Sequence, residues 1–294
     1  MGETLQGLLE LLDLEEIDRN IYRGRNERAQ RDRLFGGQVA AQALAAAGRT
    51  VDARVAHSLH AYFLRPGDPR VPVLYTVDRI RDGQSFSTRR IVAVQRGQAI
   101  FNMSVSFQVI ETGYEHQQLE MPDAPPPESL PTWAERAEQA KHLLPKESFA
   151  WVRDDDRPID LRHVEAPTFL GGAARRGGNL VWFRASSALP ENPFLHQCVV
   201  AYASDMSLLD TVVIPHGRSG PLGPVMMASL DHALWFHRAL RADDWLLYAQ
   251  DSPAAAGARG FARGTIFTRE GVLVASVAQE GLMRPTGRPD DRSL

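Results

Sequence analysis

Gln279 is a polar side chain in a position where apolar side chains would be expected. It closes an apolar run that begins at Val272, and the alternation of a β-strand places it on the same face as Val277. A buried amide without partners costs roughly 2–7 kcal/mol on transfer scales. Gln279 therefore either ends its strand at the surface or belongs to a buried polar group with a task.

Asp205 lies within a helical pattern, and Ala201 and Leu208 share its predicted face. A carboxylate on an apolar face needs a partner or a metal ion, whereas an Asp at the helix surface needs neither. A carboxylate can also accept a proton from a water molecule that attacks a carbonyl carbon, which is general-base catalysis.

Ser229 falls on the next predicted strand, where a serine is commonly structural. A nucleophilic serine would need a paired base, normally a histidine. The chain has no G-x-S-x-G motif, and "HGRSG" at 216–220 has the wrong spacing. A hydroxyl that bonds a water molecule is the better supported chemical role.

The elements that would position these residues repeat in two halves. Each half reads as a helix followed by strands, and "SLH" and "LYTVD" of the first half correspond to "SLDH" and "LYAQD" of the second. The first half comprises a helix over 36–50 and strands within 57–69, 73–80 and 86–110, the last with a turn at Arg96–Gly97. The second comprises a helix over 196–212 and strands within 225–238, 245–252 and 260–281, the last with a turn at Glu270–Gly271. Each helix must bury its apolar side against its sheet.

Other segments flank and join the two halves. The N-terminal residues form the pattern of an amphipathic helix and lack the basic region of a signal peptide. Five prolines between 122 and 131 start a linker, and a short helix is predicted over 132–144.

Composition narrows the class of protein. A net charge of −3 excludes the basic surface that nucleic-acid binding usually needs, and no apolar run is long enough to span a membrane. The single cysteine, Cys198, excludes an internal disulfide and indicates a reducing compartment such as the cytoplasm. Cys198 could be a nucleophile, but its apolar neighbours favour a small buried residue.

Several stretches, in the same order along the chain, resemble one known family. They are "LFGGQVAAQAL", "HAYFLRPGDP", "RDGQSFSTRR", "YASDMSLLDT", "DHALWFHR", "WLLY" and "VASVAQEGLMR". They closely resemble the acyl-CoA thioesterase II family over roughly residues 5–285. The resemblance implies an α+β double hotdog fold, in which two tandem domains each wrap an antiparallel sheet around a long helix. We expect an N-terminal hotdog domain over 1–115, a proline-rich linker with a short helix over 116–165, and a C-terminal hotdog domain over 166–294.

The resemblance also implies the chemistry. Members hydrolyse fatty acyl-CoA to a free fatty acid and coenzyme A by direct attack of water, without a cofactor or a metal ion. Matched motif by motif, the catalytic residues are Asp205, Ser229 and Gln279. The resemblance further implies a homo-oligomer, a dimer or a tetramer.

Three residues are weaker candidates for lining the substrate site. His57 matches a histidine of the family, although a strand histidine is also commonly satisfied by its surroundings. Gly36 and Gly37 open the first helix, where backbone N–H groups could bind the developing oxyanion or where glycines could simply form a tight turn. The candidates for binding the coenzyme A phosphates are Arg65, Arg89, Arg90, Arg259 and Arg263.

Two alternatives stay open. The first is a hotdog enoyl-CoA hydratase, because "ENPFLHQ" at 191–197 faintly resembles the D-x-N-P-x-H stretch of such enzymes. Pro190 occupies the position of its Asp, however, and His196 lies one residue too far along the chain. The second is a protein that binds acyl-CoA without catalysis, which would not need the three polar residues together.

Overall fold

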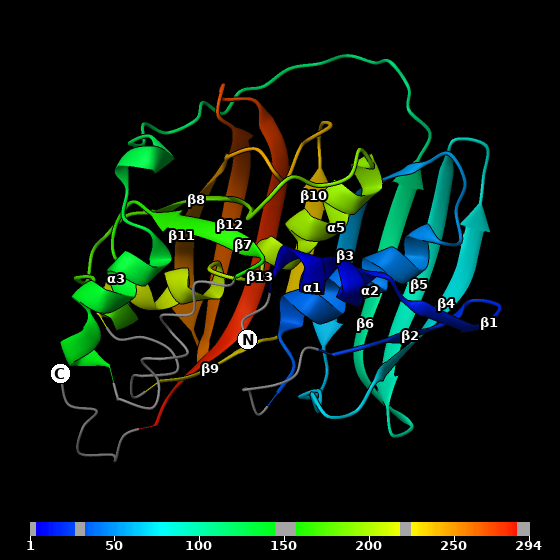
Figure 1. Cartoon of the computed structure of the whole chain (residues 1–294), viewed down its shortest axis with the longest axis horizontal. Coiled ribbons are helices and arrows are strands. Elements are labelled where there is room, and N and C mark those ends of the chain that lie inside the picture. Colours follow the sequence, from blue (N-terminus) through cyan, green and yellow to red (C-terminus); the bar gives the residue numbers. More distant parts are fainter. Residues whose placement is uncertain (1–3, 27–32, 145–156, 218–224, 287–294) are drawn as a thin grey trace.

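Two helices, α2 (Gly36–Gly48) and α5 (Pro193–Ala203), pack together on one face of a continuous antiparallel sheet (Figure 1). The structure is a computed structural model, and it describes residues 4–26, 33–144, 157–217 and 225–286. The predicted N-terminal helix is α1 (Leu5–Leu12), and the predicted short helix after the prolines is α3 (Trp133–Gln139). The described residues also contain four 3₁₀ helices: η1 (Pro127–Ser129), η2 (Lys141–Leu143), η3 (Thr168–Leu170) and η4 (Leu209–His216).

Thirteen strands of the described part of the chain form the sheet. The first half of the chain supplies β1 (Glu15–Asp18), β2 (Ile21–Gly24), β3 (Val55–Phe63), β4 (Val73–Asp82), β5 (Phe86–Gln95) and β6 (Gln98–Gln108). The second half supplies β7 (Ile159–His163), β8 (Asn179–Ala185), β9 (Val225–Ser229), β10 (Asp231–Phe236), β11 (Leu246–Ala256), β12 (Arg259–Thr268) and β13 (Leu273–Pro285).

The strand order confirms the repeat that the sequence predicts. It runs β1-β2-β4-β5-β6-β3-β10-β13-β12-β11-β8-β7, and β9 also pairs with β13. Each half therefore has the same order when it is followed inward from its outer edge, and the halves join where β3 pairs with β10. Each half contributes one helix to the covered face, which is the expected α+β double hotdog architecture.

The domain boundaries at 115 and 165 stay a prediction. Strand β7 lies inside the range 116–165 and pairs with β8, so this range contains an outer strand of the second half as well as α3. Residues 145–156 of the same range lie outside the described part of the chain.

The hairpins form at the predicted turns. Arg96 and Gly97 have φ angles of 49° and 75°, as a tight two-residue turn between right-twisted strands requires. Gly271 has a φ of 85°, which a glycine adopts without steric strain. These turns set the register of β5 with β6 and of β12 with β13.

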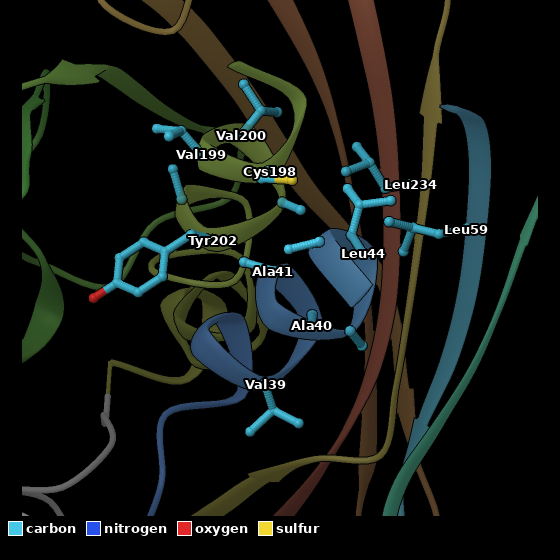
Figure 2. Close-up of a cluster of buried hydrophobic side chains, with 14 of the residues drawn as sticks. Val39, Ala40, Ala41, Leu44, Leu59, Cys198, Val199, Val200, Tyr202 and Leu234 are labelled. Atoms are coloured by element: carbon cyan, nitrogen blue, oxygen red, sulfur yellow. The ribbon is translucent and has the colours of Figure 1, made fainter. Parts of the chain in front are cut away.

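The core lies between the helix pair and the sheet. Leu44 of α2 meets Leu59 of β3 and Leu234 of β10 where the halves join, and all three are fully buried (Figure 2). Gly48 is the last residue of α2, and its missing side chain makes room for the ring of Phe194 on α5.

The segment after β6 passes over the top of the molecule to α3 (Figure 1). Gln117 bonds the backbone of Gly271 and Leu273, and the indole of Trp182 donates to the Pro125 carbonyl. Within the described residues, no helix combines the length and the apolar character needed to cross a bilayer.

Candidate active site

One amide joins the three polar residues singled out in the sequence. Nε2 of Gln279 lies 2.8 Å from Oδ1 of Asp205 and 2.8 Å from Oγ of Ser229. An amide nitrogen has two hydrogens, so both can be donated, one to the carboxylate and one to the hydroxyl. The Ser229 hydroxyl then accepts from Gln279 and keeps its own hydrogen to donate.

Asp205 does not lie within a helix, which corrects the expectation of one helix over 196–212. Helix α5 ends at Ala203, a turn follows, and the 3₁₀ helix η4 begins at Leu209. Two serines of the turn form hydrogen bonds to strands of the sheet. Ser204 contacts His232 on β10, and Ser207 accepts a hydrogen bond of 2.6 Å from Gln250 on β11. These tertiary bonds replace the helical continuation and hold the Asp205 turn against the sheet.

Ser229 faces the site because the strand over 225–238 is interrupted. Strand β10 pairs Ala233 with Ala278, whereas β9 pairs Ser229 with Gly281, so the register shifts by one residue between the two strands. At the shift, the carboxylate of Asp231 accepts the Glu280 N–H at 2.6 Å. Uninterrupted alternation would have put Ser229 on the opposite face, and this bulge therefore turns it toward Gln279.

Gln279 is completely buried on the helix-covered face of β13, as the alternation from Leu273 predicts. Two residues further along, Gly281 leaves space that the Leu209 side chain fills, which lets the segment after α5 approach β13. The NH₂ group is used within the cluster, and Oε1 is buried without a hydrogen-bond partner in the described part of the chain.

The start of α2 closes the other side of the cluster. A Cβ atom on Gly36 would lie only 2.7 Å from Oδ2 of Asp205 and 2.8 Å from the Phe63 ring. A Cβ on Gly37 would collide with the Tyr202 carbonyl of α5. Close packing therefore requires glycines here, and Gly36 lets the start of α2 lie against the Asp205 carboxylate.

Burial favours the neutral forms of the titratable groups around Asp205. Burial, together with the charge of Asp205, raises the pKa of Asp210 to about 7. The same two causes raise the pKa of Tyr248 well above its ordinary value. Burial lowers the pKa of His232 to about 4, and the neighbouring Gln279 side chain opposes that shift in part. A carboxylate beside neutral groups in a poorly solvated place is suited to accepting a proton.

His57 lies apart from this cluster. Its Nε2 atom is 2.7 Å from the Ser106 hydroxyl, and its ring packs edge-on against Phe86 at 5.6 Å. Gly36 adjoins Phe63 at the other end of β3. The structure thus brings Gly36 to the three polar residues and does not bring His57.

The prediction that Arg89 is a candidate for binding phosphate is wrong, because its side chain is buried. Its side chain is 1% exposed, and it bonds the hydroxyl and carbonyl of Thr50, the carbonyl of Arg81 and the carboxylate of Asp82. Arg90, Arg259 and Arg263 are exposed and pair with carboxylates, whereas Arg65 bonds the Ala99 carbonyl. Sequence alone shows no difference between a buried structural arginine and an exposed one.

Two further candidates have structural roles. Nδ1 of His196 accepts the Ala242 N–H at 2.9 Å, and the ring is 3% exposed, so it is not available as the acid or base of a hydratase. Cys198 is buried, as predicted, and burial raises the pKa of its thiol. Among the described residues, no three His, Cys, Asp or Glu side chains gather as metal ligands would.

His232 and Asp210 were missed as neighbours of the site. His232 alternates with Leu234 and Phe236, which are buried, so the period-two pattern could have placed the imidazole on the same face as the core. No pattern in the sequence distinguishes Asp210 from a surface Asp, because its position depends on how η4 packs against the sheet.

Family models, curated relatives and solved structures all match this chain to the same protein family. A family model described as acyl-CoA thioesterase matches residues 135–282, and one described as acyl-CoA thioesterase N-terminal domain matches residues 25–108. Mouse acyl-coenzyme A thioesterase 8 is 42% identical over 282 residues, which cover 93% of this chain and 88% of the mouse protein. The crystal structure of acyl-CoA thioesterase II TesB2 from Mycobacterium marinum has a TM-score of 0.76 and 43% identity, with 96% and 98% of the two chains covered.

A more distant structure supports the fold alone. A protein of unknown function with a hot dog fold from Alicyclobacillus acidocaldarius has a TM-score of 0.76 at 17% identity, with 94% of this chain and 97% of the other covered. The double hotdog architecture thus extends to chains with little sequence in common with this one.

Proposed function

Because the chain belongs to the acyl-CoA thioesterase family, we propose that it hydrolyses fatty acyl-CoA to a free fatty acid and coenzyme A. The observation that carries the mechanism is the Gln279 amide, which donates to Asp205 and to Ser229 at 2.8 Å each. Three side chains from distant parts of the sequence thereby define one place where a water molecule can be bound and deprotonated.

Asp205 acts as the general base in this proposal. It accepts a proton from the water molecule, whose oxygen attacks the thioester carbonyl carbon. The carbon–sulfur bond then breaks, coenzyme A leaves as a thiolate, and the proton held by Asp205 is returned to the leaving group or to solvent. Ser229 helps to hold the water molecule, and it forms no bond to the acyl group.

Hydrogen-bond donors must stabilise the negative charge that develops on the thioester oxygen. The first N–H groups of α2, at Gly36 and Gly37, lie at the positive end of a helix dipole, and Gly36 packs against Asp205. We assign the oxyanion site to them, since preorganised backbone donors are worth roughly 10²–10³-fold in rate.

The hydratase alternative is not favoured, because His196 is used in a structural bond to Ala242. A protein that only binds acyl-CoA would have no use for a buried Asp–Gln–Ser cluster, whose polar groups are expensive to bury. The resemblance also supports a homo-oligomer, a dimer or a tetramer, which light scattering on the purified chain would test. The single cysteine supports a cytoplasmic location.

The function is tested by release of free thiol from acyl-CoA substrates of increasing chain length. Asp205→Asn should lower kcat by roughly 10²–10⁴-fold, the usual worth of a general base, with a much smaller change in KM. Asp13→Asn, which removes an exposed carboxylate paired with Arg49, is the matched control and should leave kcat unchanged. No thiol release from any chain length by the folded parent would contradict the proposed function.

A further inference from the structure

Two buried polar atoms without partners belong to residues that face each other. Among the described residues, Oε1 of Gln279 and Nδ1 of His232 both lack a partner of ordinary hydrogen-bond geometry. Gln279 is 0% exposed and His232 is 1% exposed, so water does not readily reach either atom. A buried polar atom left without a partner costs about 1–3 kcal/mol, and two together call for an explanation.

The strand register places the two side chains next to each other. Strand β10 pairs Ala233 with Ala278, so the next pair outward along the same ladder is His232 with Gln279. Directly opposed residues share a face and have Cβ atoms about 4.5–5.5 Å apart. Both side chains lie on the buried face, along with Leu234 and Val277.

The pKa of His232 reflects its neighbour Gln279. The Gln279 side chain acts to raise this pKa, as an amide oxygen near an imidazole N–H would. Burial is the stronger influence and keeps the ring neutral at physiological pH. A neutral imidazole carries one N–H, so its position on Nδ1 or Nε2 decides whether His232 can donate to Gln279.

Ser204 can set that position. Its Oγ atom lies 2.9 Å from Nε2 of His232 and 3.1 Å from the Ala201 carbonyl, and its one hydrogen can serve only one of these acceptors. If the hydroxyl donates to Nε2, the ring proton sits on Nδ1 and points at Gln279. If it donates to Ala201, Nε2 holds the proton, and two acceptors, Nδ1 and Oε1, face each other in a buried place.

We propose that His232 is a positioning residue for the reaction: Ser204 fixes its Nδ1–H tautomer, and Nδ1–H holds the amide oxygen of Gln279. The NH₂ group of Gln279 is then directed at Asp205 and Ser229. The reversed amide would place its oxygen against the Asp205 carboxylate and would break both bonds. The kinetic part of this inference rests on the proposed function, and the tautomer does not.

The first test is ¹⁵N NMR of the histidine-labelled parent near pH 7, with the His232 signals assigned from their loss in His232→Asn. The ring nitrogens should report a neutral imidazole with the proton on Nδ1. A proton on Nε2 would overturn the proposal, whether or not the protein proves to be a thioesterase.

The second test compares two amide replacements by thiol release and thermal melting. The side-chain amide of Asn can occupy the place of Nδ1, and that of Gln the place of Nε2. His232→Asn should therefore keep kcat within about fivefold of the parent, whereas His232→Gln should lose at least about tenfold in kcat with little change in KM. If His232 only filled space, Gln, which is closer to histidine in volume, would be the better replacement, and that ranking would refute the proposal.

His237→Asn is the control for the same substitution at a neighbouring histidine. His237 is exposed at the end of the same β-ladder and, like His232, contacts a serine hydroxyl, that of Ser276 at 2.8 Å. Its replacement should leave both kcat and the melting temperature unchanged.

Discussion

Replacing Gly36 with alanine should slow turnover while leaving the protein folded. The added Cβ would lie 2.7 Å from Oδ2 of Asp205 and 2.8 Å from the Phe63 ring, where ordinary contact begins near 3.4 Å. Either the carboxylate or the start of α2 must therefore move by about 0.7 Å, and a misplacement of about 1 Å at a reacting group can cost roughly 10²-fold in rate. We expect kcat to fall by about 10- to 100-fold.

Stability should respond much less to this change. Gly36 does not have a left-handed backbone, so alanine can adopt its conformation, and alanine favours the helix by up to about 1 kcal/mol over glycine. That gain offsets part of the strain of the close contact. Thiol release at saturating acyl-CoA and a thermal melt on the same sample separate the two effects.

Gly7→Ala is the matched control. Gly7 lies in α1, where an added Cβ would meet Thr4 Oγ1 at an ordinary 3.6 Å. It should leave kcat unchanged. If Gly36→Ala also kept kcat within about twofold at an unchanged melting temperature, the start of α2 would not abut the reacting carboxylate, and the site geometry described above would be refuted.

Three other substitutions test separate parts of the account. Gly48→Ala pushes a methyl group into the Phe194 ring at the far end of α2. It should lower the free energy of unfolding in urea by about 1–3 kcal/mol without lowering kcat of the folded protein. An unchanged unfolding midpoint would contradict that packing. The pKa of Asp210 is raised to about 7, so the parent should lose stability as the pH rises from about 4 to 7. Asp210→Asn should remove that loss, and the melting temperatures of variant and parent should therefore diverge over this range. A difference between them that did not grow with pH would contradict this reasoning. Ser229→Thr keeps the hydroxyl and should keep most of kcat, whereas Ser229→Ala should lose about 10²-fold but not all activity; equal losses in the two variants would argue against a role for the hydroxyl.

Much of the architecture could be predicted because it depends on local patterns. The matching fragments "LYTVD" and "LYAQD", the turn at Arg96–Gly97 and the apolar alternation before Gln279 all have simple physical causes, and the structure agrees with each. The resemblance to the family added the grouping of three distant polar residues, which no spacing rule would have supplied.

The parts that could not be predicted depend on tertiary contacts. Leu208 and Leu209 continue the helical spacing of α5, yet bonds from Ser204 and Ser207 to the sheet end the helix before Asp205. The bulge before Asp231 reverses the facing of Ser229, and it is visible only in the pairing with β13. Gly48 illustrates the same limit, since its role comes from Phe194 on another helix.

The most direct test of the mechanism is rapid-quench mass spectrometry of the parent enzyme during turnover of a fatty acyl-CoA. Direct attack by a water molecule bound between Asp205 and Ser229 predicts that no acyl mass appears on the protein at any time and that coenzyme A is released without a burst. An acyl adduct on Ser229 that decays at the turnover rate would contradict the account, since it would make Ser229 a nucleophile.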